Sequence, residues 1–254
     1  MAQRLRNTVA LVTGASSGIG EATALQLAAE GATVAIAARR EERLDELARK
    51  IRDAGAHALV VVADVSDREQ AVGCVETTVA DLGRLDIVVN NAGQMLLGPV
   101  AEQPVEEIDR MLALNLQGLI HVSQAALPHL RSAAQDPPRR VADLVNVSSV
   151  AGRRANAGAA VYNATKHGVG AFSEALRQEV TREHVRVSLV EPGAVATELL
   201  SHNRPEIQEA SARRLGDLDP LRAQDIADAI SFVVTRPRHV AVNEVLVRPT
   251  EQQQ

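Results

Sequence analysis

Aromatic side chains are scarce in this chain of 254 residues, which contains no Trp, two Phe and a single tyrosine, Tyr162. Aromatic residues make up only 1% of the sequence, whereas hydrophobic residues of all kinds make up 46%. A core must therefore be built from Ala, Val, Leu and Ile, a composition typical of parallel sheets that are buried under helices on both faces. The length suits one open α/β sheet folded as a single domain.

Cysteine is also scarce, because Cys74 is the only one in the sequence. It cannot form an internal disulfide, and the seven histidines are scattered without metal-ligand spacing, so we expect a reducing compartment and no metal site. No apolar run is long enough to span a membrane, and residues 1–7 are polar with two arginines, unlike a secretory signal. These features predict a soluble, cytoplasmic protein with no membrane partner.

Positive charge is in the minority, since 27 basic side chains stand against 32 acidic ones and the net charge is -5. This balance opposes binding to phosphate backbones, so we expect no nucleic acid as a partner.

The only lysines are Lys50 and Lys166. Lys166 follows Tyr162 by four positions and would share its helix face, where an ammonium lowers the phenol pKa and permits proton exchange near neutral pH. The alternative is an ordinary helix residue with a solvated lysine.

Short β-rich runs alternate with amphipathic stretches along the chain. Helices are predicted over residues 21–30 and 41–54, and Gly31 and Gly55 suit the left-handed position after each helix. Helix-connected parallel strands predict one doubly wound α/β domain over residues 1–254, with helices on both faces and ligands beyond the carboxyl ends of the strands. Residues 135–140 are expected to form a surface loop. Seven strands are predicted: Val9–Val12, Thr33–Ala37, Ala58–Val62, Asp86–Asn90, Asp143–Val147, Val185–Val190 and Val242–Val247.

A glycine-rich turn lies between the first predicted strand and the first helix, with the spacing Gly-x-x-x-Gly-x-Gly over residues 14–20. Glycines allow the backbone of such a turn to approach a pyrophosphate closely, and free N–H groups with the positive end of the helix dipole face the anion. The alternative is a tight connection without a ligand. The predicted phosphate-binding residues are Gly14, Ser16, Ser17, Gly18, Ile19 and Gly20.

The end of the second predicted strand indicates which nicotinamide cofactor binds. An acidic residue at this place would bind the ribose 2′-hydroxyl of NAD, but the sequence has Ala38 followed by Arg39 and Arg40. A guanidinium suits a 2′-phosphate, so NADP(H) is the expected cofactor. The alternative is that these arginines only begin a charged surface helix.

Five motifs occur in order along the chain: the glycine-rich turn, Asn90-Asn91-Ala92-Gly93, Ser149 thirteen residues before Tyr162, Lys166, and Glu191-Pro192-Gly193. Together they resemble the short-chain dehydrogenase/reductase family over essentially the whole length. Residues 95–100, 172–180 and 247–250 are particularly similar to NADPH-dependent reductases of the clavulanate dehydrogenase type. The Rossmann fold is the fold that this resemblance implies.

The resemblance implies that Tyr162 donates a proton to a carbonyl oxygen while hydride arrives from the nicotinamide, and that Ser149 hydrogen-bonds the same oxygen. A hydroxyl and a phenol aimed at a developing alkoxide suit this chemistry independently. Lys166 would lower the phenol pKa and bind the nicotinamide ribose, and Asn115 matches the asparagine that holds a proton-relay water. Ser148 is the neighbouring rival of Ser149, and we expect it instead to be a buried hydroxyl bonded to the backbone.

The resemblance also implies contacts with the cofactor. Asp64 would face the adenine, Asn90 would support the central strand, and Val195 would contact the carboxamide through its backbone. Thr197 would contact the phosphates, and a helix N-cap is its alternative role. The further cofactor-binding residues implied are Asp64, Val65, Asn91, Ala92, Gly93, Tyr162, Lys166, Pro192, Gly193, Val195 and Thr197.

The substrate is expected to be a small carbonyl compound or alcohol, covered by a charged lid near residues 197–219. Arg153, Arg154 or Arg248 is a candidate partner for a substrate carboxylate, because a guanidinium can bind a carboxylate through two hydrogen bonds; a surface salt bridge is the alternative. The family resemblance implies a homo-oligomer, a tetramer or dimer, assembled through residues 104–131, 162–183 and 242–247.

Three functions are compatible with the sequence. The first is reduction of an aldehyde or ketone with NADPH in secondary metabolism, and the second is oxidation of a small 3-hydroxy acid. The third is a non-catalytic regulator that senses NADPH. The regulator has no need of a proton donor, so the presence of Ser149, Tyr162 and Lys166 favours an enzyme.

Overall fold

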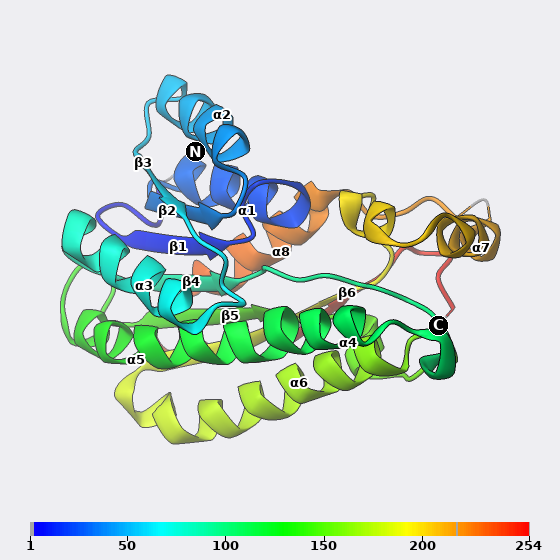
Figure 1. Cartoon of the computed structure of the whole chain (residues 1–254). Coiled ribbons are helices and arrows are strands. Elements are labelled where there is room, and N and C mark those ends of the chain that lie inside the picture. Colours follow the sequence, from blue (N-terminus) through cyan, green and yellow to red (C-terminus); the bar gives the residue numbers. More distant parts are fainter. Residues whose placement is uncertain (1–2, 217, 254) are drawn as a thin grey trace.

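A computed structural model describes residues 3–216 and 218–253, so Met1, Ala2, Gln254 and Asp217 of the expected lid lie outside the described residues. The described chain contains a parallel sheet of seven strands in the order β3-β2-β1-β4-β5-β6-β7 (Figure 1). All seven predicted strands are confirmed, although the last begins two residues later than expected. Their bounds are β1 Val9–Thr13, β2 Thr33–Ala38, β3 Ala58–Val62, β4 Ile87–Asn90, β5 Ala142–Val147, β6 Val185–Pro192 and β7 Glu244–Val247.

Helices cover both faces of the sheet, as expected (Figure 1). On one face lie α1 (Gly18–Ala29), α2 (Glu41–Asp53) and α8 (Ala223–Val234), and on the other lie α3 (Arg68–Leu82), α5 (Leu119–Gln135) and α6 (Ala160–Val180). Gly31 and Gly55 follow the C-caps of α1 and α2 with φ of 95° and 83°, which confirms their predicted left-handed conformations. None of the described helices has the length and apolar character needed to cross a membrane.

The core is aliphatic, as the scarcity of aromatic residues predicts. Every residue of β1 is buried, and its side chains alternate between two hydrophobic clusters. Ala10 and Val12 belong to the cluster under α1 and α8, whereas Val9 and Leu11 belong to the one under α3 and α5. Alternation on a strand buried on both faces explains why the strands appear in the sequence as nearly continuous apolar runs.

The strand order reverses beside β1. The chain builds β1, β2 and β3 outward in one direction, then returns to place β4 on the other side of β1, where Ala10 pairs with Ile87. In open α/β sheets a ligand binds at such a reversal, beyond the carboxyl ends of the strands. The turns after β1, β4, β5 and β6 therefore meet at one edge of the sheet, and these turns carry the predicted site.

The expected lid is largely helical. After β6 and a short turn, the chain forms the 3₁₀ helix η5 (Glu198–His202) and then α7 (Pro205–Leu215), which projects to the side of the helical layers (Figure 1). The expected surface loop at residues 135–140 is confirmed between the end of α5 and the start of β5. Its position at the opposite end of β5 keeps it away from the predicted site.

Candidate active site

The glycine-rich turn after β1 folds tightly against the turn after β4. Gly14 and Gly18 have φ of 65° and 56°, a backbone conformation that other residues rarely adopt. A Cβ atom on Gly14 would lie 2.7 Å from Cα of Ala92, and one on Gly20 would lie 2.3 Å from the carbonyl oxygen of Gly14. Side chains at these places are therefore excluded by close packing.

Asn91 links the two turns through hydrogen bonds. Its side-chain amide donates to the carbonyl oxygens of Thr13 and Gly14 at 3.0 and 3.2 Å. In return, the hydroxyl of Thr13 accepts from the backbone N–H groups of Asn91 and Ala92 at 3.1 and 3.2 Å. The structure thereby brings the predicted cofactor-binding residues of two distant segments into contact.

Arg40 lies across the glycine-rich turn. Its Nη2 donates to the hydroxyls of Ser17 and Ser16 at 2.7 and 3.0 Å, and its Nε donates to Ser16 at 3.1 Å. Because both serines accept, their own O–H groups can donate to an anion, and that of Ser17 already interacts with the carboxylate of Glu198. Arg39 lies nearby, with its Nη1 3.7 Å from a carboxylate oxygen of Asp64.

This set of donors fits a dinucleotide that carries an additional phosphate. Ser17 occupies the N-cap position of α1, but among the described residues its side chain makes no capping hydrogen bond, so the first N–H groups of the helix stay available to an anion. Two guanidinium groups stand beside these N–H groups at the end of β2. The site residues therefore match the chemistry of NADP(H).

Tyr162 and Lys166 lie together on the buried side of α6, as their spacing predicts. Each is only 6% exposed, and the lysine Nζ is 5.9 Å from the centre of the phenol ring. Tyr162 packs against Leu96 and Met111, and Lys166 donates to the carbonyl oxygen of Val147 at 2.9 Å. The alternative of a solvated lysine is therefore wrong.

The pKa values of this pair differ from the expectation. Burial raises the pKa of Tyr162 to about 12, and a hydrogen bond with Ser149 offsets only part of that shift. Burial also lowers the pKa of Lys166 to about 8. The expectation that Lys166 lowers the phenol pKa toward neutrality is wrong for these residues alone, because apolar side chains surround the phenol and the ammonium is bonded to a main-chain oxygen.

Two neighbouring serines after β5 have different surroundings. The hydroxyl of Ser149 accepts from the N–H of Ala151 at 3.1 Å and shares a hydrogen bond with Tyr162. Ser148 is 4% exposed and donates to the carbonyl oxygen of Lys166 at 3.2 Å. The prediction that Ser148 is a buried hydroxyl bonded to backbone is confirmed, and Ser149 is the serine placed beside the phenol.

Asn115 lies in a wide helical turn between α4 (Val105–Leu112) and α5. This π-helical segment, η2 (Ala113–Gly118), is of a kind that often occurs at functional sites. The Asn115 side chain, 1% exposed, accepts from the N–H of Gln94 at 2.7 Å and donates to its carbonyl oxygen at 2.8 Å. A Cβ on Gly93 would lie 3.4 Å from Asn115 Oδ1 and 3.9 Å from Lys166 Nζ, so these groups converge on one place.

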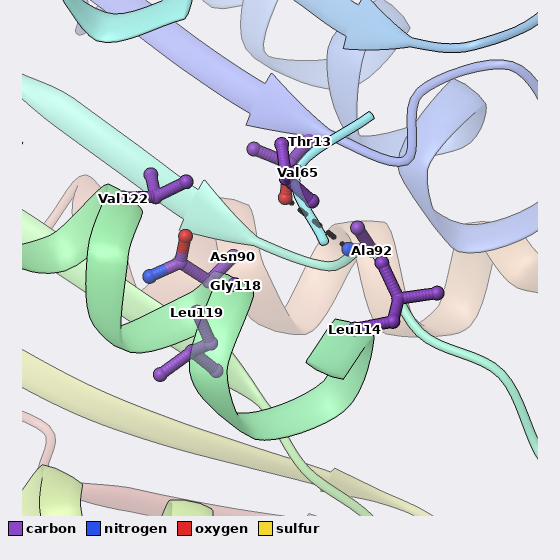
Figure 2. Close-up of a pocket in the computed structure, with 8 residues that line it drawn as sticks. All are labelled: Thr13, Val65, Asn90, Ala92, Leu114, Gly118, Leu119 and Val122. Carbon is purple, nitrogen blue, oxygen red and sulfur yellow. Dashed lines mark hydrogen bonds between the residues drawn. The ribbon is translucent and has the colours of Figure 1, made fainter. Parts of the chain in front are cut away.

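Asn90 holds the central strands together behind this place. Figure 2 shows it at the end of β4, facing Gly118 and Leu119 near the start of α5. Its amide donates to Ser123 on α5 and to Asn146 on β5, both at 2.9 Å. These bonds support the strand that presents Asn91, Ala92 and Gly93.

The turn after β6 reaches over the glycine-rich turn. The backbone N–H of Gly193 bonds to Val247, and Val195 pairs with Leu221 in an isolated bridge. Thr197 accepts from the N–H of Leu199 at 3.4 Å as the N-cap of η5, which confirms its expected capping role. Its methyl group would also lie 3.1 Å from a Cβ on Gly18, so the same residue borders the predicted phosphate site.

Contacts that the sequence did not indicate hold the lid. Asn203, 7% exposed, accepts from the N–H of Leu97 at 2.7 Å and donates to the carbonyl oxygen of Met95 at 2.8 Å. Glu198 accepts from Arg40 at 2.9 Å and lies 3.3 Å from Arg43. Each pair joins segments about a hundred or more residues apart, so only the fold reveals them.

The three arginines considered for a substrate carboxylate are not equivalent. Arg153 donates to the buried Glu191 at 2.6 Å and also pairs with Glu244, which favours the ion-pair alternative for this residue. The side chain of Arg154 is exposed and has no ion pair among the described residues. Arg248 is half-buried, and its Nε has no hydrogen-bond partner in the described chain.

No cluster of three or more His, Cys, Asp or Glu residues suited to a metal occurs in the described ranges.

Known proteins resemble this chain over nearly its whole length. An uncharacterized oxidoreductase of Staphylococcus epidermidis is 37% identical over 246 residues, which cover 97% of this chain and 99% of that protein. A metagenomic short-chain oxidoreductase solved with NADP is 32% identical, with a TM-score of 0.81 and coverage of 97% and 99% of the two chains. The closed form of a serine dehydrogenase solved with NADP+ is 30% identical, with a TM-score of 0.88 and coverage of 97% of each chain. Residues 8–208 match the short chain dehydrogenase family, and the chain belongs to this family of oxidoreductases.

Proposed function

We propose that this protein catalyses the reversible reduction of an aldehyde or ketone to an alcohol with NADPH. The observation that carries the proposal is the convergence of Ser149, Tyr162, Lys166 and Asn115 at one edge of the sheet, beside Gly93 and the glycine-rich turn. Proton donors and an ammonium at one place, next to a dinucleotide site, suit hydride transfer to a carbonyl.

The protonation states of these residues suit a carbonyl reductase at neutral pH. With a pKa of about 12, Tyr162 keeps its proton and can give it to an alkoxide as that forms, while Ser149 donates a second hydrogen bond. Lys166, with a pKa of about 8, is mostly charged at pH 7, and its ammonium can donate to the nicotinamide ribose. Asn115 holds the Gly93-Gln94 segment against the site. NADPH, when bound, supplies the hydride.

Arg39 and Arg40 support NADPH as the cofactor, and the NADP-bound relatives described above support the same assignment. A charge-assisted hydrogen bond contributes roughly 1.5 to 3 kcal/mol, so Arg39→Ala should raise the KM for NADPH about 10- to 100-fold. The KM for NADH should change little, because NADH has no 2′-phosphate. Equal effects on both cofactors in initial-rate assays would reject this assignment.

Two substrate classes compete. Similarity to reductases of the clavulanate dehydrogenase type supports an aldehyde or ketone of secondary metabolism. The serine dehydrogenase relative supports the alternative, a small 3-hydroxy acid, and Arg154 or Arg248 would then pair with its carboxylate. Initial rates with matched neutral and acidic carbonyl compounds, and with 3-hydroxy acids plus NADP+, separate the two classes. Equal turnover of neutral and acidic compounds would reject a contact between an arginine and a substrate carboxylate.

The proposal also places the enzyme in the cytoplasm as a homo-oligomer, a tetramer or dimer. Phe232 on α8 and Leu246 on the edge strand β7 are large apolar residues that are 50% and 41% exposed, and association of two copies would cover them.

A regulator that senses NADPH is the non-enzymatic alternative. Steady oxidation of NADPH by a panel of aldehydes and ketones supports the enzyme, whereas tight NADPH binding with no turnover across the panel supports the sensor.

A further inference from the structure

Glu198 is the first residue of η5 and faces the cations at the start of α2. One carboxylate oxygen accepts from Arg40 Nη1 at 2.9 Å, and the other lies 3.3 Å from Arg43 Nη1. The hydrogen bond from Arg40 holds the pKa of Glu198 below its ordinary value, so the group is an anion at neutral pH. A carboxylate is thus already bound between two guanidinium groups.

Four of the five N–H groups of Arg40 are used in this arrangement, and one on Nη1 remains. Nε and Nη2 donate to the hydroxyls of Ser16 and Ser17, and Nη1 donates to Glu198. A phosphate that binds Arg40 through two hydrogen bonds must replace one of these partners. The two serines are neutral and can turn their O–H groups toward the phosphate, although that of Ser17 also interacts with Glu198, whereas Glu198 repels the phosphate.

We propose that Glu198 is a specificity-determining residue for the cofactor, whose carboxylate competes with the 2′-phosphate of NADPH for Arg40 and Arg43. The inference rests on the proposed function, which gives Arg40 to that phosphate. Glu198 weakens NADPH binding and leaves NADH binding unchanged, so it reduces the ratio by which the protein binds NADPH more tightly than NADH. The side chain of Glu198 is 38% exposed to solvent, so its carboxylate can leave the arginines without unfolding of the turn.

The test is Glu198→Gln in the full-length chain, with dissociation constants measured by calorimetry for NADPH, NADH and 2′,5′-ADP. Glutamine keeps the size of the side chain and removes its charge. Loss of a partly exposed ion pair and of the repulsion should tighten NADPH and 2′,5′-ADP by roughly 3- to 10-fold. The dissociation constant of NADH should stay within roughly 2-fold of wild type, because NADH has no 2′-phosphate to compete for Arg40 and Arg43 and partly exposed charge pairs contribute little.

Glu206→Gln is the matched control. Glu206 is also a lid carboxylate, is 65% exposed and faces Arg204 rather than the cofactor site, so its substitution should change none of the three constants. Glu198→Ala should shift the constants in the same direction as Glu198→Gln, and thermal melting of each variant checks that the fold is kept.

The outcomes distinguish this inference from the proposed function. If wild type prefers NADPH and Glu198→Gln leaves that preference unchanged or reduces it, Glu198 does not compete with the 2′-phosphate, while the assignment of NADPH as the cofactor stands. If wild type binds NADH as tightly as NADPH, the cofactor assignment itself fails. A selective gain for the two phosphate-bearing ligands supports the proposal.

Discussion

The two edges of the parallel sheet both bury charge, but they use it differently. At the edge formed by the amino ends of the strands, Asp143 and Asp86 are paired with arginines. At the opposite edge, where the strands end, Lys166 and the hydroxyl of Tyr162 keep hydrogen-bonding capacity that the fold does not use. The comparison indicates that paired buried charge stabilises one edge, whereas buried polar groups with spare hydrogen-bonding capacity lie at the proposed active site on the other.

Asp143 is itself fully paired at the amino edge, although Nη1 of its partner Arg139 is buried without a hydrogen-bond partner among the described residues. Its two oxygens accept from Nε and Nη2 of Arg186 at 2.7 and 3.0 Å, and Arg139 donates to it at 2.7 Å. The remaining donors of Arg186 reach main-chain oxygens, including that of Val240 at 2.7 Å. Asp143 is fully buried and Arg186 is 7% exposed, so this network is almost closed to solvent.

The largest effect is expected at the carboxyl edge, from Tyr162→Phe. The variant keeps the ring that packs against Leu96 and Met111 but removes the hydroxyl that we propose as the proton donor. General acid catalysis contributes about 10²- to 10⁴-fold, so kcat should fall by that factor while the dissociation constant of NADPH and the melting temperature stay near wild type. Stopped-flow rates and calorimetry measure the two quantities. A variant that turned over normally would show that another group protonates the product.

A second large effect, on stability alone, is expected at the amino edge from Asp143→Ala. The change leaves the guanidinium of Arg186 buried and unpaired, which costs about 3 to 5 kcal/mol. Urea unfolding should show this loss, while kcat per folded molecule should not change, because Asp143 lies at the opposite end of β5 from Ser149. Asp45→Ala on the exposed side of α2 is the control and should shift stability by less than about 0.5 kcal/mol. A kcat that fell with Asp143→Ala would contradict the separation of the two edges.

The sequence predicted most of the carboxyl edge because its signals are local. The glycine-rich turn, Ser149 with Tyr162 and Lys166, and the glycines after α1 and α2 each lie within a short stretch whose spacing implies a geometry. All seven strands followed from short runs of β-forming residues between amphipathic stretches. These features depend on backbone conformation and helix periodicity, which neighbouring residues decide.

The contacts that could not be predicted join distant segments or depend on burial. Arg40 and Glu198 are 158 residues apart, and Leu97 and Asn203 are 106 apart, so no local pattern pairs them. The pKa of Tyr162 was expected in the wrong direction because the spacing to Lys166 is visible in the sequence, whereas the apolar surroundings of the phenol appear only in the fold. The π-helical turn at Asn115 likewise had no signal in its sequence.

Lys166 gives an effect that depends on pH. Burial lowers its pKa from the ordinary 10.5 to about 8, so between these values the unfolded chain binds more protons than the folded one. Stability should therefore rise as pH increases from about 8 toward 10.5, and Lys166→Met should remove this slope. Tyr162 acts oppositely only above pH 10, its ordinary pKa, since the folded pKa is about 12. Urea unfolding at pH 7.5, 8.5 and 9.5 checks the sign; identical slopes in both proteins would mean that the ammonium is solvated.

The smallest effect is expected from Ser148→Ala, compared with Ser149→Ala next to it. Ser148 makes one neutral hydrogen bond, to the carbonyl oxygen of Lys166, so its loss should cost about 1 kcal/mol of stability and leave kcat near wild type. Ser149→Ala removes the hydroxyl that we propose as a donor to the developing alkoxide and should lower kcat by about 10²-fold or more. Steady-state rates and urea unfolding of both variants make a matched comparison, because the same atom is deleted from adjacent residues at one edge of the sheet. If Ser148→Ala were the variant that lost activity, the hydroxyl beside the phenol would not be the one that binds the substrate oxygen.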